Sequence, residues 1–409
     1  MNIKFYTLGC RVNQLESAAM EAELKKRGHV IVESGADAVV VNSCAVTAES
    51  ARKSRQAVRR LMKENPGAFL AVCGCWAQAE PEEAEKLGAM LIGGSGDRMA
   101  FIDAMCAGAG GTMIGDPKKR REPELLGSAI MEGRTRAYLK VEDGCQNYCS
   151  YCIIPFLRGP VRSVPIDPAA RAAAECAAPE LTITGIELAS YQYGLGELLK
   201  AVGKAAPDKR LRLGSLEPRA IDEEFCRTAA EVAGLCPHFH LSLQSGCDAT
   251  LRRMGRCYDT ARFYRSVELL REYFDNCGIT ADLITGFPGE TEDEFAQTLE
   301  FMEKCAFSHV HIFPYSERKG TKAAVMENSV PKKLREERAA RAAELAARME
   351  RSFLAAQKGS EQDVLFETRI GHTPNYCAVE PPCPGMAGSI KKVKINGVDM
   401  VNMTLISAI

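Results

Sequence analysis

Short apolar runs alternate with amphipathic stretches over residues 1–115 of the chain. The apolar runs have the length of strands, and the stretches between them carry apolar residues at the spacing of one helix face. Strands that alternate with helices are typical of a parallel sheet with helices on both faces, so this region predicts a doubly wound α/β domain. The predicted strands are Ile3–Leu8, Ala38–Val41, Phe69–Cys73 and Met90–Ile92, and the predicted helices are Leu15–Lys26, Glu49–Lys63 and Pro81–Leu87.

Residues 116–133 break this alternation, because charged residues and prolines follow one another there without an apolar period. We predict a linker over this segment.

A second alternating region spans residues 134–358 and contains six strand-like runs with helical patterns between them. Six β/α units predict a partial parallel barrel, whose functional residues are expected at the C-terminal ends of the strands. The predicted strands are Ala137–Val141, Leu181–Thr184, Leu211–Leu213, Phe239–Leu243, Thr280–Ile284 and His309–Phe313, and the predicted helices include Asp259–Tyr273, Thr291–Lys304 and a closing helix within Pro331–Lys358.

The last region, residues 361–409, loses helical character and contains strand-like Val364–Phe366, Lys391–Ile395 and Val401–Ile406. A small β-barrel that binds RNA is one interpretation. A β-cap that only stabilises the barrel before it is the alternative.

The chain has 409 residues, of which 46% are hydrophobic and 26% charged, and its formal net charge is −1. Because the chain as a whole is not basic, any surface that binds nucleic acid must be a local basic patch. The candidates are the basic run Lys118–Arg121 and the segment Lys332–Arg351, for which a solvated linker and an exposed helix face are the alternative interpretations.

The N-terminus runs directly into a predicted strand without a signal peptide, and no apolar run approaches the roughly 18 residues of a membrane span. We expect a cytoplasmic protein without membrane association. The sequence contains 17 cysteines. Disulfides are rare in the cytoplasm, so clustered cysteines there more often bind metal or do redox chemistry.

Three cysteines, Cys145, Cys149 and Cys152, follow the first predicted barrel strand at the spacing C-x3-C-x2-C. A cubane iron–sulfur cluster usually takes four cysteine ligands, so three would leave one iron open for a ligand that is not protein. A structural zinc site closed by a distant ligand and a set of ordinary thiols are the alternatives.

Three further cysteines, Cys10, Cys44 and Cys75, each follow a predicted strand of the first domain. Ligands of open α/β sheets bind outside the carboxyl ends of the strands, so these thiols are expected to converge there as a second metal site. Cysteines in the core of the domain are the alternative. Cys73 alternates onto the same side as Cys75 but lies within its strand, so we predict Cys75 as a ligand and Cys73 as a core residue.

Several segments resemble the methylthiotransferases of the radical S-adenosylmethionine (SAM) superfamily, and together they extend over the whole chain. The opening motif is similar to that of the branch that acts on threonylcarbamoyladenosine in tRNA. The resembling segments are Thr7–Ser17, Asn42–Thr47, Gly74–Gln78, Tyr138–Gly159, Gly214–Pro218, Leu241–Gly246, Asp282–Glu290 and Phe313–Ser316.

The resemblance implies two [4Fe–4S] clusters and SAM as cofactors. It implies Cys10, Cys44 and Cys75 as ligands of an auxiliary cluster, and it favours Cys75 over Cys73. It also implies that the C-terminal segment is a TRAM-type RNA-binding barrel, although this segment looks abbreviated. The family's glycine-rich SAM motif corresponds to Thr184-Gly185-Ile186-Glu187.

The implied activity is methylthiolation of C2 of N6-threonylcarbamoyladenosine at position 37 of tRNA, next to the anticodon. The implied partners are the tRNA anticodon loop and an electron donor such as flavodoxin or ferredoxin, and we expect a monomer; the sulfur donor is not identified. Isopentenyladenosine in tRNA or a ribosomal protein is an alternative substrate. A zinc-stabilised RNA-binding module without catalysis is the alternative outside this class.

Candidate SAM contacts lie near the predicted ends of the barrel strands: Gly185, Ser215, Glu217, Gln244 and Arg256. Turn formation or core packing is the alternative role of each. Sequence-specific RNA recognition favours unstacked bases, so Phe156 or Tyr315 is a candidate to stack on the substrate base, with core packing as the more ordinary role.

Overall fold

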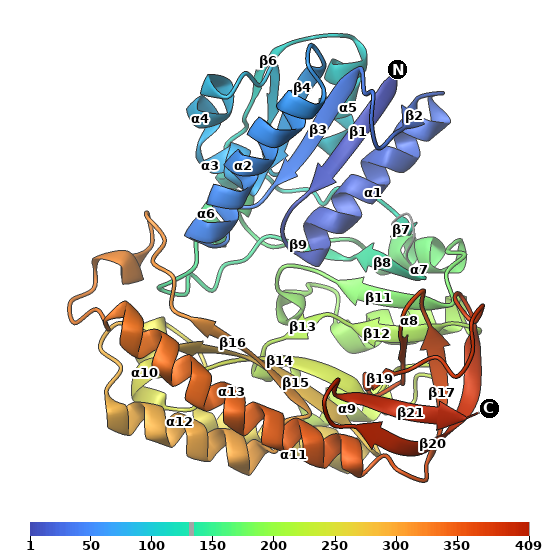
Figure 1. The fold of residues 1–409 in the computed structure, drawn as a ribbon, viewed down its shortest axis with the longest axis vertical. Coiled ribbons are helices and arrows are strands. Elements are labelled where there is room, and N and C mark those ends of the chain that lie inside the picture. Colours follow the sequence, from blue (N-terminus) through green and yellow to red (C-terminus); the bar gives the residue numbers. More distant parts are fainter. Residues whose placement is uncertain (131–134, 409) are drawn as a thin grey trace.

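The computed structural model describes residues 1–130 and 135–408. The predicted boundary between residues 133 and 134 and the terminal residue 409 lie outside these ranges. Figure 1 shows three parts: an N-terminal α/β domain, a central open barrel, and a small barrel of strands at the C-terminal end. The predicted fold class is confirmed in all three parts.

The N-terminal sheet has six parallel strands in the order β2-β1-β3-β4-β5-β6. The strands are β1 (Asn2–Thr7), β2 (Val30–Ile31), β3 (Ala38–Ser43), β4 (Phe69–Gly74), β5 (Leu91–Gly93) and β6 (Gly111–Met113). The sequence did not predict β2 and β6, because each has only two or three residues and none of them is buried, whereas the equally short β5 is an apolar, fully buried run.

Helices cover both faces of this sheet, which makes it doubly wound (Figure 1). One face of the sheet packs against α2 and includes Val39, Val41 and Val72. The other face packs against α1 and α5 and includes Val40 and Ala71. Successive strand residues point to opposite faces, so both faces are apolar. The helices are α1 (Arg11–Lys26), α2 (Ala48–Glu64), α3 (Cys75–Ala79), α4 (Pro81–Lys86) and α5 (Arg98–Cys106).

Six parallel β/α units form the central barrel, as predicted. Its two hydrogen-bonded sheets, β12-β11-β8-β7 and β13-β14-β15-β16, join where β12 continues directly into β13. The strands are β7 (Ser128–Ile130), β8 (Arg136–Lys140), β9 (Glu142–Asp143), β10 (Arg162–Ser163), β11 (Glu180–Thr184), β12 (Arg210–Leu213), β13 (Ser215–Leu216), β14 (His238–Gln244), β15 (Gly278–Thr285) and β16 (His309–Pro314).

Helices surround the outside of the barrel, and their apolar faces form one large core with the strands. Thr291 and Glu294 start α12 with a capping box. The helices are α6 (Ile154–Arg158), α7 (Ile166–Ala174), α8 (Leu195–Ala205), α9 (Glu223–Ala230), α10 (Asp248–Met254), α11 (Thr260–Tyr273), α12 (Glu292–Cys305) and α13 (Lys332–Ala355). None of the described helices combines the length and the apolar composition that crossing a membrane requires.

The long helix α13 contains the second basic segment that the sequence singled out as a nucleic-acid candidate. Three of its arginines form ion pairs within the protein: Arg338 with Glu290 at 2.8 Å, Arg341 with Glu292 at 2.5 Å and Arg348 with Glu303 at 3.4 Å. The structure therefore supports the interpretation of this segment as an exposed helix face held by ion pairs.

The connector between the two large domains packs against both of them. A short 3-10 helix, η1 (Pro117–Lys119), lies against α6, and β7 pairs antiparallel with β8. A Cβ atom at Gly159 would collide with the Pro117 carbonyl, so the approach of η1 to the end of α6 requires glycine there.

The C-terminal region closes into a five-stranded barrel, which confirms the prediction of a small β-barrel. Asp399 accepts hydrogen bonds from the N–H groups of Val401 and Asn402, so the last strand begins three residues later than predicted. The strands are β17 (Glu361–Phe366), β18 (Gly371–His372), β19 (Ala378–Val379), β20 (Ile390–Asp399) and β21 (Thr404–Ala408).

Arginines at the N-terminal ends of the central strands bind this small barrel, since Arg210 donates to the Asp363 carbonyl at 3.0 Å and Arg212 donates to the Pro374 carbonyl at 3.0 Å. A buried carboxylate holds these arginines in place. Glu180 forms ion pairs with Arg136 at 2.8 Å, Arg210 at 2.8 Å and Arg212 at 3.2 Å. The ring of Tyr376, from the C-terminal barrel, lies under the guanidinium groups of Arg136 and Arg212. The strand ends opposite this junction stay free for a functional site.

Candidate active site

Three cysteines of the N-terminal domain meet at the carboxyl edge of its sheet. Cys10 is the N-cap of α1, Cys44 follows β3, and Cys75 is the first residue of α3. The strand order places β1 beside β3 and β3 beside β4, so the three thiols line one cavity of about 550 Å³ between this domain and the barrel. Their convergence is what the sequence predicted from the strand ends.

Two glycines allow these strand ends to approach one another. A Cβ atom at Gly9, where φ is 109°, would lie 2.9 Å from the Cβ of Cys44. A Cβ atom at Gly74, where φ is 97°, would meet the Ser43 carbonyl and lie 2.6 Å from Asn42 Oδ1. Side chains do not fit at either position, so the tight turns before Cys10 and Cys75 require glycine.

Cys73 and Cys75 lie on opposite faces of the sheet. Cys73 is buried with Met20 and Phe101 on the α1 and α5 side, whereas Cys75 packs with Trp76 on the other side. The expectation that strand alternation places both on one side was wrong, because the turn at Gly74 ends the strand and starts α3. The core position of Cys73 agrees with the prediction that Cys75 is the ligand.

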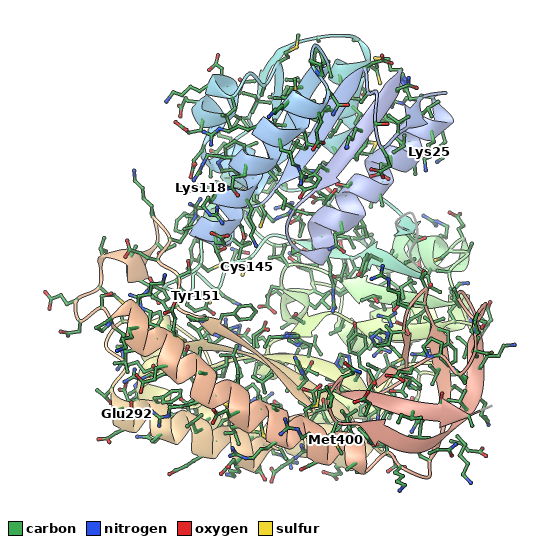
Figure 2. The ribbon with its side chains drawn as sticks, in the orientation of Figure 1. Lys25, Lys118, Cys145, Tyr151, Glu292 and Met400 are labelled. Carbon is green, nitrogen blue, oxygen red and sulfur yellow. The ribbon has the colours of Figure 1, made fainter. Side chains whose placement is uncertain are left out.

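The second set of cysteines lies in the loop that follows β8 and β9. Cys145 and Cys152 pack against the same apolar cluster that contains Cys75, and Cys149 is buried. Ser150 anchors the loop to the end of α10, since its N–H donates to the Met254 carbonyl at 2.8 Å. Figure 2 shows Cys145 in the region between the N-terminal domain and the barrel.

The chemistry of both donor sets fits iron–sulfur clusters. Burial raises the pKa of Cys145 and of Cys152 to about 12, and desolvation also raises the pKa of Cys10, Cys44 and Cys75. Thiols in such sites keep their protons at neutral pH until a metal replaces them. All 17 cysteines are free thiols, so none of the six is occupied by a disulfide.

Neither cysteine set forms a ready-made site for a single metal ion among the described residues. Within residues 1–130 and 135–408, no three His, Cys, Asp or Glu side chains are arranged to hold a single metal ion. Each set also offers three thiols of one kind, the donor type that iron–sulfur clusters prefer.

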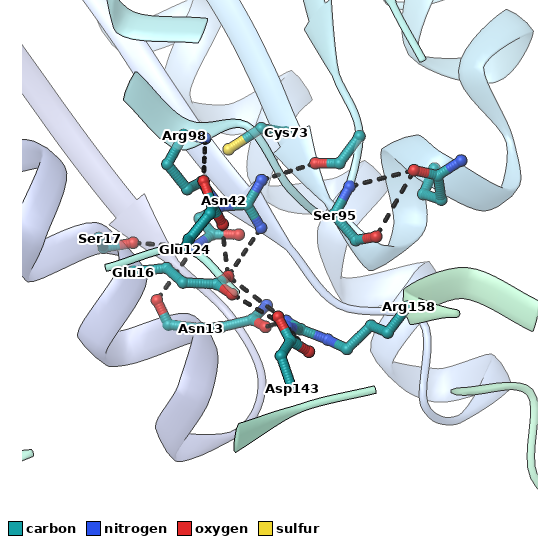
Figure 3. Close-up of polar contacts among 12 residues, drawn as sticks. Asn13, Glu16, Ser17, Asn42, Cys73, Ser95, Arg98, Glu124, Asp143 and Arg158 are labelled. Atoms are coloured by element: carbon teal, nitrogen blue, oxygen red, sulfur yellow. Dashed lines mark hydrogen bonds and ion pairs between the residues drawn. The ribbon is translucent and has the colours of Figure 1, made fainter. Parts of the chain in front are cut away.

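A buried network of charges lies between the two domains, and Figure 3 shows Glu16, Arg98, Asp143 and Arg158 of this network. Glu16 of α1 forms ion pairs with Arg98 at 2.7 Å, Lys140 at 3.0 Å and Arg158 at 2.9 Å. Asp143 accepts from Lys140 at 2.7 Å and from Arg158 at 3.0 Å. Glu16 lies six residues after Cys10, and Asp143 lies two residues before Cys145, so this network fixes one loop relative to the other.

A second polar group lies at the top of the barrel beside Cys149. Arg256 donates to the Sγ of Cys149 at 3.1 Å and pairs with Glu217 at 3.4 Å. Asn147 donates to Glu187 at 2.9 Å. Burial and the neighbouring Glu217 raise the pKa of Glu187 to about 7.

The five predicted SAM contacts divide into three groups. Glu217 and Arg256 belong to the polar group beside Cys149, and Gly185 and Ser215 line the cavity with the N-terminal cysteines. Gln244 is not among the residues that line this cavity. It ends β14 at a bulge, with a φ of 63°. The role of all five in binding SAM stays a prediction.

Several residues of the site were not found from the sequence. Asn147 lies in the three-cysteine loop, of which only the cysteines were predicted to be functional. Glu187 lies in the motif Thr184-Gly185-Ile186-Glu187, of which only Gly185 was predicted to contact SAM. His240, Asp282 and His311 come from three neighbouring strands and line the cavity. The alternation of histidines in β14 and β16 was the available signal, because residues two apart share one face of a strand.

Comparison with known proteins agrees with this architecture. Residues 2–93 match the family described as Uncharacterized protein family UPF0004, and residues 139–302 match the Radical SAM superfamily. The radical SAM methyltransferase TsrM of Kitasatospora setae has a similar fold, with a TM-score of 0.59 at 15% identity over 79% of this chain and 75% of that chain.

Two relatives cover most of the chain. The threonylcarbamoyladenosine tRNA methylthiotransferase MtaB of Thermotoga maritima is 39% identical over 82% of this chain and 80% of that protein. A tRNA-2-methylthio-N(6)-dimethylallyladenosine synthase of Erythrobacter litoralis is 31% identical over 92% of this chain and 88% of that protein.

A parallel α/β domain with three converging cysteines, followed by a barrel with a three-cysteine loop, defines the methylthiotransferase class of radical SAM enzymes. Within this class, the chain belongs to the family of threonylcarbamoyladenosine tRNA methylthiotransferases.

Proposed function

We propose that this protein methylthiolates C2 of N6-threonylcarbamoyladenosine at position 37 of tRNA. The observation that carries the proposal is the shared cavity. Cys10, Cys44 and Cys75 line it from one domain, and Gly185 and Ser215 line it from the barrel strand ends. Ile154, two residues after Cys152, also lines it, whereas the three cysteines of the second loop lie outside its lining. The reaction replaces the hydrogen on C2 by a methylthio group, which requires both metal centres to reach the same carbon.

Members of this family use SAM and two [4Fe–4S] clusters. Cys145, Cys149 and Cys152 would hold the cluster that reduces and cleaves SAM, and the N-terminal set would hold the auxiliary cluster. A cluster held by these three cysteines would keep one iron open for SAM and would supply the electron for its cleavage.

The chain's own residues position these groups. Arg256 and Asn147 place donors beside Cys149, where they can orient the polar groups of SAM. Ile154 and Leu157 of α6 pack between the two cysteine sets and exclude water from the region that joins them. A water-poor cavity protects a radical from side reactions.

An exposed aromatic pair at the cysteine loop is suited to RNA. Tyr148 and Phe156 are 48% and 43% exposed, and their rings meet edge to face with centroids 5.7 Å apart. Exposed aromatic rings stack on unpaired bases of single-stranded nucleic acid. Phe156 thus lies at the surface rather than in the core, whereas Tyr315 is 7% exposed and packs against Phe287.

The basic run adjoins this pair. Lys118 and Lys119 of η1 and Arg121 after it are exposed, and η1 lies against α6, which carries Phe156. Arg120 instead donates to Ser95 Oγ at 2.8 Å and takes a structural role. We expect Lys118, Lys119 and Arg121 to contact phosphates of the anticodon stem-loop, which makes tRNA binding weaken with salt.

We also infer that the protein acts as a cytoplasmic monomer and takes electrons from a donor such as flavodoxin or ferredoxin. The absence of a membrane-crossing helix among the described residues is consistent with this. Sedimentation of the reconstituted protein with and without tRNA tests the monomer. NADPH-dependent SAM cleavage with each purified donor and the reductase of that donor tests the electron source.

Mass spectrometry of tRNA nucleosides from a deletion strain tests the activity. We expect 2-methylthio-N6-threonylcarbamoyladenosine to disappear, its precursor to accumulate, and the wild-type gene to restore the product. Genes carrying Cys149→Ala or Cys44→Ala should fail to restore it. An unchanged product in the deletion strain overturns the proposal.

Iron analysis of the same variants separates the two metal sites. The protein reconstituted without oxygen should bind about eight irons, and each variant should bind about four. Cys73→Ala is the matched control, because that thiol packs in the core, and it should keep all eight.

The dimethylallyladenosine relative makes the isopentenyl substrate the second candidate. The same nucleoside profile decides between them, since loss of the 2-methylthio-isopentenyl product with an unchanged threonylcarbamoyl product would favour the alternative.

A further inference from the structure

Arg11 lines the shared cavity and has no ion-pair partner among the described residues. It is the first residue of α1 and follows directly after Cys10. Its guanidinium forms no hydrogen bond or ion pair with any residue that the structure describes. The other arginine of the cavity, Arg158, is neutralised by Glu16 and Asp143. Arg11 is therefore available to a ligand.

The side chains that face Arg11 come from the barrel interior. Arg11 lines both the shared cavity and a second cavity of about 230 Å³ that contains His238, His240, His309 and His311. Glu350 also lines the second cavity, but it accepts a hydrogen bond from His309 at 2.9 Å and forms no ion pair with Arg11. This part of the cavity is suited to an anion.

Asp282 lines the same cavity as Arg11 but forms no ion pair with it. His240 uses one ring nitrogen on Asp282 Oδ2 at 3.1 Å and the other on Thr280 Oγ1 at 2.9 Å. His311 has no hydrogen-bond partner among the described residues, and its ring lies against the rings of His240 and His309, with centroid separations of 5.7 Å and 4.7 Å. Two free donors therefore remain, Arg11 and His311.

We propose that Arg11, assisted by His311, binds the carboxylate of the threonylcarbamoyl group and so selects this substrate. The inference rests on the proposed function and adds the residues that read the base. The threonylcarbamoyl group extends from N6 of the same ring that carries C2, so a base bound with C2 towards Cys10 would bring this carboxylate towards Arg11, the next residue. A guanidinium binds a carboxylate through two parallel hydrogen bonds.

The same arrangement rejects an apolar substituent. An isopentenyl group in this part of the cavity would displace water from Arg11 without replacing its hydrogen bonds. A site that leaves a buried polar group unpaired discriminates strongly against the analogue that lacks the partner. Arg11 thus acts in substrate binding rather than in the chemistry at C2.

Neutralising the carboxylate tests this binding. Anticodon stem-loops carrying threonylcarbamoyladenosine, its methyl ester, or isopentenyladenosine are offered to the reconstituted enzyme and to Arg11→Gln. We expect the wild type to prefer the free acid over the ester by about tenfold or more in kcat/KM. Arg11→Gln should lose this preference through KM, with iron content unchanged.

Lys26→Gln is the matched control, because it removes one positive charge from the far end of the same helix. Its preference should equal that of the wild type. Equilibrium binding of the acid and ester stem-loops is measured in parallel, so the test does not depend on turnover by Arg11→Gln. The proposal is supported if the wild type binds the acid stem-loop more tightly than the ester stem-loop and Arg11→Gln binds both with the same affinity.

If Arg11→Gln discriminates between acid and ester as the wild type does, the assignment of Arg11 is overturned and the proposed function stands. If the wild type modifies only the isopentenyl stem-loop, the proposed function itself fails.

Discussion

Arg256 shows how one side chain connects the barrel to the iron–sulfur loop. Its guanidinium contacts Cys149 Sγ, Glu217 and the ring of Tyr258. The sequence suggested Arg256 as a SAM contact. The structure adds a direct hydrogen bond to a predicted cluster ligand, and hydrogen bonds to sulfur are one means by which a protein sets a cluster's potential.

Replacing this arginine should change the potential without removing the cluster. We expect Arg256→Gln to keep the full iron content, because all three thiols remain, but to lower the reduction potential of the cluster held by Cys149. A shift of roughly 60 mV corresponds to a tenfold change for one electron. A redox titration followed by electron paramagnetic resonance measures it.

Arg252→Gln is the control for charge alone, since Arg252 is exposed on α10 close by in the sequence. A potential that is the same in Arg256→Gln and the wild type would contradict the role of the hydrogen bond.

The turn between the elements β4 and α3 positions Cys75, a predicted cluster ligand. Gly74 ends the strand, and the positive φ there redirects the chain so that Cys75 starts a helix at the cavity. Ser43 contributes from the neighbouring strand, because its hydroxyl accepts from the Ala77 N–H at 3.2 Å. The short helix thus has its place fixed by the strand beside it.

Gly74→Ala should destabilise the protein much more than the same change at Gly67. Both glycines have positive φ, 97° and 83°, but a Cβ at Gly67 meets nothing within 4 Å. We expect about 1 kcal/mol for Gly67→Ala from backbone strain alone and about 3 kcal/mol or more for Gly74→Ala. Denaturant unfolding measures both, and equal losses would contradict the steric argument.

Buried charges hold the domains together at the scale of the whole molecule. Glu16 is fully buried and bound by three cations from the N-terminal domain and the barrel. These cations lower the pKa of Glu16 against the effect of burial. The spacing between the two cysteine sets therefore depends on this carboxylate.

Glu16→Gln should cost about 3–5 kcal/mol, because it leaves buried cations without their counter-charge. Glu23→Gln on the same helix removes only an exposed pair with Arg27 and should cost less than about 1 kcal/mol. Unfolding of both variants in denaturant measures the difference. A loss in Glu16→Gln no larger than that in Glu23→Gln would show that the network adds little to stability.

Acid should weaken the junction between the central barrel and the C-terminal barrel, where Glu180 holds three arginines in place. Burial opposes ionisation there, but Arg212, Arg136 and Arg210 lower the pKa of Glu180 from 4.5 to about 2. The folded state therefore gains stability from the carboxylate above pH 4.5 and loses it as the pH falls towards 2. The gain is about 3 kcal/mol at neutral pH.

The unfolding midpoints of the wild type and Glu180→Gln, compared between about pH 6 and about pH 3, measure this effect. The gap between the two proteins should narrow as the pH falls. A gap that stays constant would mean that the charge of Glu180 contributes nothing to the junction.

The order of the elements and the positions of the cysteines could be predicted from the sequence. Periods of two and of 3.6 residues are local properties, so β1, β3, β4 and the six barrel strands were found with small errors at their ends. Cys10, Cys44 and Cys75 followed predicted strands, and parallel strands bring their carboxyl ends to one edge. That rule was enough to predict their convergence.

Other features depend on contacts between residues far apart in the chain, and only the tertiary structure decided them. Cys73 and Cys75 separated because a turn at Gly74 interrupted the strand period. Glu16 found its partners across the domain boundary, more than a hundred residues away. Whether an arginine has a counter-charge also depends on the folded chain. Arg158 forms ion pairs with Glu16 and Asp143, whereas Arg11, five residues before Glu16, forms none among the described residues.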